Sequence, residues 1–585
     1  MVTPFSWSQP HPVNDHVAGA SAELRRRGHE VVVLAPSGRA GPLAAGRRAL
    51  KRLGGAGTPL EGVVALGPSI PVSRRSSLGV PIGVRAALEL ALTRDRFDVV
   101  HGHEPGLPSL SYLALRHARG LAVATFHSSE RLAYPPGKKQ RERLLGRVDA
   151  LTATSPATAE AAAARFPGDY TVLPLGVDLE LFAPTDPRRR FLVEWRPDEQ
   201  PRLRAAFRAL GDLAGWKLVV LRTKSLAGRP YVPRALRGRV VVRTALDEQT
   251  RAAELAGAAG LVPSLRPTAR LAIEAQAAGV PLVDPPGSAN QPELVSAALA
   301  RLAEDPDWRA TSSAEARRRA EKQSFGRLAD DLERLYGAVL RKRRARPLET
   351  ADPLADRPLV LADLHMHTEH SHDCAVPVPD LLDHAERIGL GAIAVTDHNA
   401  FSGAEEAVDL ARGRPLTVIP GEEVKTDAGE VIGLFLSEEI PRGMSWVDTI
   451  AAIREQGGVV YLPHPFDRLH TIPDAGTLHR HLGEIDVFEV YNARLLFETF
   501  NEEALRFARK YNLTMGAGSD AHVLQGVGTG LVHMHAFETA EEFLISLRTA
   551  EIVRRPKSLL YLQGLKWVAQ ARERRAKASA GQALR

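Results

Sequence analysis

Histidines and carboxylates follow short apolar runs at five places in the C-terminal part of this chain. The runs end in His365-Met366-His367, Asp397-His398, Glu422-Glu423, His464-Pro465 and Asp520-Ala521-His522. Imidazole nitrogens and carboxylate oxygens are ligands that zinc and iron accept in proteins. Carboxylates can also bridge two ions, and paired ions catalyse phosphoester hydrolysis. These residue types therefore predict a metal-dependent hydrolytic site.

The apolar runs before these residues are typical of buried strands, and they read LVLADL, GAIAVT, PLTVIPG, GVVYLP and LTMGAGS. In a β/α barrel the carboxyl ends of the strands meet on one face, where active sites are built. His365 and His367 are two residues apart on such a strand, so both imidazoles point to the same side and can reach one ion. We therefore expect a barrel with the site at its carboxyl face.

The distribution of histidine along the chain supports a dedicated site. Seven histidines occur up to His127, none occurs between 128 and 364, and thirteen occur from His365 onward. The single cysteine, Cys374, excludes a disulfide within the chain, which predicts a reducing, cytoplasmic compartment.

The motifs DLHMHT, TDHN, PGEEV, HPFD and GSDAH resemble the polymerase and histidinol phosphatase (PHP) superfamily over residues 359–540. The resemblance implies a distorted (β/α)7 barrel that holds two or three zinc, manganese or iron ions and hydrolyses phosphoesters. The ligands that it implies are His365, His367, Asp373, His398, Glu423, His464, Asp520 and His522. His372 is an alternative to Asp373, and Asp397 is expected behind the ligands, orienting a histidine.

One ligand of that family is replaced in this sequence. Where many members have a histidine after the glutamate strand, this chain has Glu430, which we predict to bind an ion. Cationic and polar residues at the rim of the barrel are candidates for holding the phosphate, namely Lys425, Arg468, Asn492 and Arg494. Of these, Arg468 and Arg494 are predicted to be catalytic.

The N-terminal part alternates strand-like runs with amphipathic helices, which predicts parallel sheets covered by helices. Strands are expected at 30–36, 97–103, 121–127, 171–177, 217–221, 239–243 and 279–286, with helices at 20–28 and 108–118. Residues 1–185 are similar to retaining GT-B glycosyltransferases, in particular phosphatidylinositol mannosyltransferases. The resemblance implies a nucleotide-sugar in a cleft between two Rossmann-like halves. It places His127, which we predict to be catalytic, near the reacting sugar, with Asp15 and His16 in the acceptor-side loop.

Four departures from that family affect groups that bind phosphate or ribose. The family's first-loop glycines are His11 and Pro12, and its donor-side glycine and arginine are Val193 and Glu194. Arg202 or Arg204 stands near the family's lysine, and the paired glutamates become Arg266 and Glu274. Glu274 and Arg202 remain candidates for binding the nucleotide-sugar. These losses predict a degenerate transferase.

The α/β chain is expected to contain five segments. They are a first Rossmann-like half at 1–185, a divergent second half at 186–340, a charged linker at 341–358, the barrel at 359–560 and a basic tail at 561–585.

Amino-acid composition and charge limit the kinds of binding partner that we expect. The chain has 585 residues, is 44% hydrophobic and 25% charged, and carries a net charge of +7. No signal peptide or membrane-spanning run is recognisable. Basic runs are scattered and lack a nucleic-acid motif, so no specific nucleic-acid binding is expected. The expected substrate is a phosphorylated small molecule or nucleotide, and an anionic lipid or glycolipid at the inner membrane face is a candidate partner.

Three functions remain open from the sequence. The first is a metal-dependent phosphoesterase fused to a degenerate glycosyltransferase-like module. The second is an active retaining glycosyltransferase with an accessory phosphatase. The third is a phosphoesterase whose GT-B half only binds a glycolipid or a nucleotide-sugar.

Overall fold

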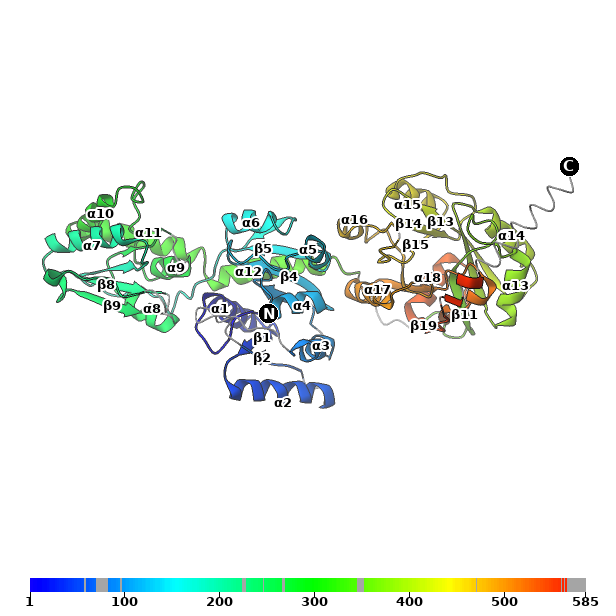
Figure 1. The fold of residues 1–585 in the computed structure, drawn as a ribbon, viewed down its shortest axis with the longest axis horizontal. Coiled ribbons are helices and arrows are strands. Elements are labelled where there is room, and N and C mark those ends of the chain that lie inside the picture. Colours follow the sequence, from blue (N-terminus) through cyan, green and yellow to red (C-terminus); the bar gives the residue numbers. More distant parts are fainter. Residues whose placement is uncertain are drawn as a thin grey trace. The chain divides into compact units, whose positions relative to one another are not determined.

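The computed structural model describes residues 1–56, 59–69, 83–94, 97–223, 228–245, 247–265, 269–344, 352–469, 471–558, 560–561 and 563–565. Its contacts divide the chain into an N-terminal unit, Met1–Leu340, and a C-terminal unit, Arg341–Arg585 (Figure 1). Arg266, part of the predicted linker and most of the predicted basic tail fall outside the described residues.

The first half of the N-terminal unit is a parallel sheet covered by helices. Its strands are β1 (Val33–Ser37), β2 (Val63–Pro68), β3 (Val99–His103), β4 (Leu121–Phe126), β5 (Ala150–Ala153) and β6 (Tyr170–Val172). Val2 forms parallel bridges to Leu34 of β1 and to Gly102 of β3, and so joins the β1-β2 pair to the β3-β4-β5-β6 sheet. The helices are α1 (Pro12–Arg26), α2 (Ala40–Ala56), α3 (Arg85–Arg94), α4 (Leu110–His117), α5 (Lys138–Leu145) and α6 (Pro156–Ala163).

The second half repeats this pattern around a parallel sheet of order β10-β7-β8-β9. The strands are β7 (Arg190–Glu194), β8 (Lys217–Arg222), β9 (Val240–Thr244) and β10 (Leu261–Val262). The helices are α7 (Gln200–Asp212), α8 (Glu248–Leu255), α9 (Ala269–Ala277), α10 (Glu293–Glu304), α11 (Pro306–Glu321) and α12 (Phe325–Leu340). Leu328, Ala329 and Leu332 of α12 pack on Ala20 and Leu24 of α1, so the last helix of this half returns to the first half.

Three predicted elements of this unit differ from the structure. The helix expected at 20–28 already begins at Pro12, because Nδ1 of His11 caps the helix at Val13 N and proline is preferred in the first turn. The strand expected at 171–177 ends at Val172. The run at 279–286 forms only a bridge between Leu282 and Leu261, since its prolines cannot donate to a sheet ladder.

The C-terminal unit is built on a nine-stranded sheet that curls into a nearly closed barrel. Strands β11 (Leu359–Met366), β12 (Ala392–His398), β13 (Thr417–Lys425), β14 (Glu430–Leu434), β15 (Val459–Leu462), β16 (Val487–Asn492) and β17 (Thr514–Gly518) are neighbours in chain order. β14 runs antiparallel to β13 and β15, and the other pairs among these seven strands are parallel. The backbone N–H of Asp520 donates to the carbonyl of His365 at 2.7 Å, and the N–H of His367 donates to that of Ala521 at 3.1 Å. These bonds bring the end of β17 back to β11.

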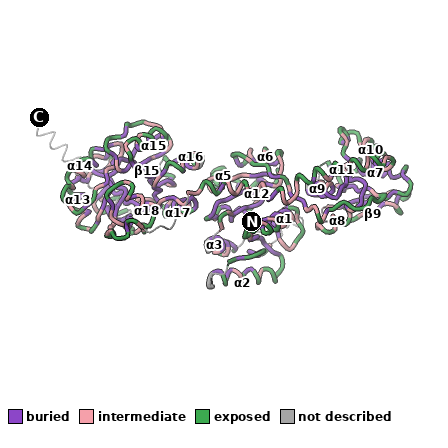
Figure 2. Tube along the Cα trace, turned by 180° about the vertical axis from the view of Figure 1, so that it is seen from behind, coloured by how far each residue is buried: buried purple, intermediate pink, exposed green. Residues whose placement is uncertain are grey.

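Two further strands extend the sheet beside β11, and helices lie outside it. The strands β18 (Gly530–His535) and β19 (Glu551–Arg554) are antiparallel to their neighbours. The helices are α13 (Val378–Arg387), α14 (Ser402–Leu410), α15 (Trp446–Glu455), α16 (Ala475–Arg480), α17 (Glu498–Tyr511) and α18 (Ala540–Thr549). Buried residues follow the strands, whereas the helices also carry exposed residues (Figure 2). The predicted fold class, two Rossmann-like halves followed by a distorted barrel, is confirmed.

Candidate metal centre

The carboxyl ends of β11, β12, β13 and β15 and the segment after β17 bring ligand-type side chains together in the C-terminal unit. Eight of the nine predicted ligands form overlapping groups of three, in which the potential ligand atoms lie within 4.8 Å of one another. The groups are His367-His398-His522, His365-Glu423-His464, His365-His367-Asp520 and His398-Glu423-Glu430. Because Glu423 and His365 each belong to two groups, the arrangement suits more than one ion.

The ninth predicted ligand, Asp373, contacts the same cluster. Its Oδ2 lies 2.9 Å from Nε2 of His522, and its Oδ1 lies 3.9 Å from Nε2 of His398. His372, the alternative, is exposed. The contacts therefore favour Asp373 as the ligand of this segment.

Glu430 begins β14 and faces the site from there. Its Oε2 lies 3.7 Å from Nε2 of His464, and it shares a potential ligand group with His398 and Glu423. The antiparallel pairing of Lys425 with Glu430 explains how it returns to the site, because a tight β13-β14 hairpin places the start of β14 beside the end of β13. Its position is compatible with metal binding in place of a histidine.

The charge of the cluster suits divalent cations. It contains the four carboxylates Asp373, Glu423, Glu430 and Asp520, and one neighbouring guanidinium, that of Arg494. Burial raises the pKa of Glu423, but His398 and His365 outweigh it and hold that pKa well below its usual value. Burial likewise opposes ionisation of Asp520, but Arg494 and His365 hold its pKa well below the usual range. Buried anionic carboxylates are costly unless cations compensate them, and imidazoles with carboxylates are a donor set that suits metal ions.

Glu489 lies behind the predicted ligands and hydrogen-bonds to four residues there, and the sequence analysis did not identify it. Its Oε1 lies 3.1 Å from Nδ1 of His365 and accepts from the Tyr461 hydroxyl at 3.0 Å. Its Oε2 accepts from the backbone N–H of His464 at 2.7 Å and from Nδ2 of Asn492 at 3.0 Å. The one available sequence signal was a carboxylate within the apolar run DVFEV. Such partners fix the orientation of histidine ligands.

Two other buried carboxylates shape the segments that carry the ligands. Asp363 accepts from the backbone N–H groups of Ser519 at 2.8 Å and Gly528 at 2.9 Å, and so holds the segment before Asp520. Asp397, expected to orient a histidine, accepts both the N–H and the hydroxyl of Thr368, each at 2.6 Å. It therefore fixes the chain directly after His367.

The backbone carries strain at two of the predicted ligand positions. His464 has φ = 26° and Asp520 has φ = 51°, values that residues other than glycine rarely adopt. Non-glycine residues in this region concentrate at functional sites, where the surrounding structure holds them.

The four predicted rim residues lie in different environments. Nη1 of Arg494 lies 3.0 Å from Oδ1 of Asp520 and 3.2 Å from Nε2 of His522. Asn492 is buried and contacts Glu489 and Asp520, so it acts behind the ligands. Arg468 pairs with Glu503 at 3.3 Å and lies over the ring of Phe500, and the Lys425 side chain is exposed. The geometry favours Arg494 as the cation that could reach a bound phosphate.

In the N-terminal unit, Glu274 is already bound by two arginines. Nε of Arg251 donates to Oε2 of Glu274 at 2.5 Å, and Nη2 donates to Oε1 at 2.9 Å. Nε of Arg270 lies 3.0 Å from Oε1 of Glu274, and its Nη2 pairs with Glu248. Arg251 also pairs with Asp15 at 3.0 Å, which links α8 of the second half to α1 of the first. Glu274 is fully buried in this network.

The other predicted residues of this unit lie at strand ends or in the first turn of a helix. His127 follows β4, and its Nε2 lies 3.0 Å from Nδ1 of His103. Arg202 is buried in α7 and pairs with Asp284 at 2.8 Å. Glu194, at the end of β7, accepts from the Thr223 hydroxyl at 3.1 Å and from the backbone N–H of Ser264 at 3.3 Å.

Models of known protein families match a stretch of each unit of the chain. Residues 363–511 match the model described as PHP domain, and residues 498–552 match that described as PHP-associated. Residues 13–181 match the model described as Glycosyltransferase Family 4. The chain joins a glycosyltransferase family 4 region to a PHP domain.

Two relatives among known proteins each match part of the chain. An uncharacterized protein of Methanocaldococcus jannaschii is 33% identical over 211 residues, which are 34% of this chain and 84% of that protein. A phosphatidyl-myo-inositol mannosyltransferase of Propionibacterium freudenreichii is 30% identical over 206 residues, which are 34% of this chain. The chain spans about half the length of that mannosyltransferase, at 51%.

Two solved structures also match parts of the chain. A structure described as a putative metal-dependent phosphoesterase of Bifidobacterium adolescentis shares 17% identity, with 34% of this chain and 97% of that chain covered and a TM-score of 0.26. A glycosyltransferase involved in avilamycin A biosynthesis shares 17% identity, with 58% and 97% covered and a TM-score of 0.34.

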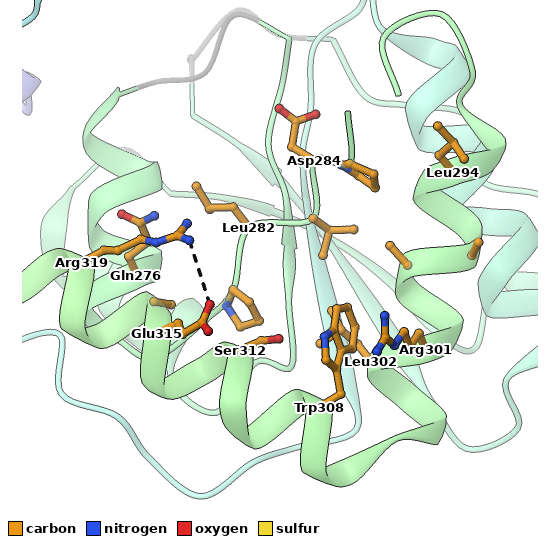
Figure 3. Close-up of a pocket in the computed structure, with 16 residues that line it drawn as sticks. Gln276, Leu282, Asp284, Leu294, Arg301, Leu302, Trp308, Ser312, Glu315 and Arg319 are labelled. Carbon is orange, nitrogen blue, oxygen red and sulfur yellow. Dashed lines mark ion pairs between the residues drawn. The ribbon is translucent and has the colours of Figure 1, made fainter. Parts of the chain in front are cut away.

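A cavity of about 490 Å³ lies in the second half of the glycosyltransferase-like unit (Figure 3). Trp308, Leu302 and Leu294 give it an apolar wall from α10 and α11, and the ion pair between Glu315 and Arg319 lies at its edge. Asp284, the partner of Arg202, also lines it. Among the described residues, no helix has both the length and the apolar character needed to cross a membrane.

Proposed function

We propose that the PHP domain is a metal-dependent phosphoesterase that hydrolyses a phosphomonoester or a phosphodiester of a small molecule or nucleotide. The observation that carries this proposal is the set of overlapping ligand groups at the strand ends, with donor atoms within 4.8 Å of one another. The proposed ligands are His365, His367, Asp373, His398, Glu423, Glu430, His464, Asp520 and His522.

When bound, two or three zinc, manganese or iron ions would supply Lewis-acid activation of water and of the phosphate oxygens. The protein's own groups perform the remaining tasks. Arg494 holds one edge of the site and is placed to donate to an anionic phosphate oxygen. Glu489 and Asn492 hold His365 and Asp520 in place, so that little reorganisation is required during the reaction.

The test is hydrolysis by the full chain, purified without chelator and assayed with zinc or manganese against a panel of phosphomonoesters, phosphodiesters and nucleotide-sugars. We expect two or three bound ions per chain by elemental analysis, and loss of hydrolysis in His365→Ala and in Asp520→Ala. His384→Ala is the matched control, because His384 lies on α13 outside the barrel and contacts Arg387. An active protein without metal, or full activity in both ligand variants, contradicts the proposal.

For the glycosyltransferase-like unit we propose ligand binding without efficient sugar transfer. The supporting observation is that Arg251 and Arg270 occupy the carboxylate of Glu274, the residue that the family resemblance assigns to the nucleotide-sugar. A ribose would have to displace a guanidinium from a buried ion pair, and breaking such a pair is costly. A nucleotide-sugar or an anionic lipid head group remains the proposed ligand.

A further inference from the structure

Three histidines meet in the first half of the N-terminal unit, in a group separate from the ligands of the PHP domain. His16 lies on α1, His103 ends β3 and His127 directly follows β4. Each offers a ring nitrogen within 4.8 Å of the others. The ring centroids are 5.9 Å apart for His16 and His103, 5.1 Å for His16 and His127, and 5.2 Å for His103 and His127.

Protein hydrogen bonds leave part of this group unsatisfied. Nδ1 of His103 and Nε2 of His127 are 3.0 Å apart and share one hydrogen bond. Nδ1 of His16 and Nε2 of His103 are buried, and neither has a hydrogen-bond partner within the part of the chain that the structure describes. The two residues are only 4% and 1% exposed. Buried polar atoms normally have hydrogen-bond partners. The two unpartnered nitrogens therefore point to a ligand that the protein itself does not supply.

The surrounding residues hold the imidazoles in position. His101 stacks on His103 with ring centroids 4.4 Å apart, and its own nitrogens contact the Tyr336 and Thr125 hydroxyls at 2.7 Å and 2.6 Å. His101 therefore supports the group and is not a ligand itself. Glu104 accepts the backbone N–H of His127 at 2.6 Å and has φ = 53°, an unusual conformation for a residue other than glycine.

The chemical form of the three side chains suits a metal. Burial lowers the pKa values of His103 and His127 well below the usual value, and it lowers that of His16 to about 3. Neutral imidazole is the form that binds metal, and it suits zinc, copper, iron and nickel.

We propose that His16, His103 and His127 bind one divalent transition-metal ion. Three imidazoles with a fourth position open to an oxygen ligand are the ligand set of catalytic zinc sites, in which zinc–nitrogen distances are about 2.0–2.1 Å. Binding requires that one nitrogen of each ring lie at about that distance from the ion. This site is independent of the phosphoesterase that we propose for the barrel.

The experiment is zinc titration by calorimetry in full-length protein that carries His365→Ala and Asp520→Ala, which weaken the barrel site. We expect this background to retain one tightly bound zinc ion per chain. Adding His103→Gln or His16→Gln should weaken that affinity by at least about 100-fold, the upper end of what loss of an outer-layer partner costs. Cobalt(II) added in place of zinc should give the visible absorption of a tetrahedral site, and either substitution should abolish it.

His29→Gln in the same background is the matched control, because His29 lies in the same unit, is half exposed and pairs with Glu333. It should leave zinc affinity unchanged. Hydrogen exchange in α1 and α4 reports whether each variant remains folded, and two independent histidine substitutions guard against misfolding of one. A background that binds no zinc, or zinc affinity that survives both His16→Gln and His103→Gln, overturns the proposal.

Discussion

Oε1 of Glu489 lies 3.1 Å from Nδ1 of His365, and both side chains are fully buried. This contact leaves Nε2 of His365 facing Glu423 at 3.3 Å and His367 at 3.3 Å. Glu489 therefore decides which nitrogen of His365 can act as a ligand, because a carboxylate on one ring nitrogen fixes the proton there.

We expect Glu489→Gln to weaken metal binding by about 10- to 100-fold, the usual effect of removing an outer-layer carboxylate from a histidine ligand. The amide still fills the space, so the fold should persist. Competition with a chromophoric chelator measures the affinity. Glu484→Gln, at an exposed position paired with His481, is the control. Equal affinities in Glu489→Gln and the parent protein would show that Glu489 only supports the strand.

Glu430 gives a second prediction, because its place in the family pattern is that of a histidine. We expect Glu430→Ala to lose one ion or to lower its occupancy, and Glu430→His to retain it, since imidazole is an equivalent ligand. Elemental analysis after gel filtration measures the occupancy. Glu439→Ala, at an exposed position beyond β14, should behave as the parent protein. Full occupancy and full activity in Glu430→Ala would assign Glu430 to the hairpin alone.

Arg494 and Arg468 should differ in their effects on hydrolysis. Arg494 contacts Asp520 and His522, whereas Arg468 pairs with Glu503. We expect Arg494→Ala to lower kcat/KM by about 10²–10³, the usual effect of losing one electrostatic donor, and Arg468→Ala to lower it by less than about tenfold. Steady-state kinetics at saturating metal distinguish the two. A larger effect at Arg468 would place the substrate on the α17 side of the site.

The sequence indicated the candidate ligands more readily than the residues that support them, for a physical reason. Strand periodicity and the convergence of strand ends suffice to place His365, His398 and Glu423 near one another. Glu489 and Asp363 lie inside apolar strands, and their roles depend on which backbone N–H groups of other strands they face. The closure of the barrel determines which backbone N–H groups these carboxylates face, and a local sequence pattern does not reveal it.

Two residues that the sequence analysis singled out, Pro12 and Glu274, have structural roles that the sequence alone did not indicate. In the family comparison, Pro12 replaces a glycine of a phosphate-binding loop. In the structure it is the first residue of α1, and the helix begins eight residues before the expected position 20. Glu274 and Arg270 stand four residues apart on α9, so their ion pair follows from helix spacing. The contacts of Arg251 with Glu274 and Asp15, in contrast, depend on the tertiary structure.

His11 should make the stability of the first half depend on pH. Its ring stacks on Phe5 with centroids 3.5 Å apart, and its Nδ1 accepts from Val13 N at 3.2 Å. Burial and Arg131 lower its pKa from 6.5 to about 3. Between these values the unfolded chain binds a proton that the folded His11 does not, so the free energy of unfolding should fall as pH drops below about 6.5.

His11→Asn tests this expectation, because asparagine retains a helix-capping acceptor and does not titrate. Hydrogen exchange of peptides from α1, corrected for intrinsic exchange rates, gives the opening free energy between pH 7 and pH 5. The variant should show a shallower dependence than the parent protein, and the exposed control His29→Asn should keep the parental slope. Identical slopes in all three proteins would show that His11 is not the titrating group.

The last prediction is that the glycosyltransferase-like unit gives at most trace sugar transfer. Transfer requires that the donor pyrophosphate is held and that its leaving charge is neutralised. Glu194 places a carboxylate where the family resemblance expects an arginine, and Thr223 and the Ser264 backbone N–H hold that carboxylate in place. Arg251 and Arg270 meanwhile occupy Glu274. Each lost electrostatic donor typically costs about 10²–10³ in rate, so two losses leave little turnover.

The measurement is transfer from GDP-mannose, UDP-glucose and related donors to inositol lipids and simple acceptors, with donor binding followed by calorimetry. We expect weak binding without multiple turnover. Robust multiple turnover that disappears in His127→Ala would establish an active transferase and refute this prediction.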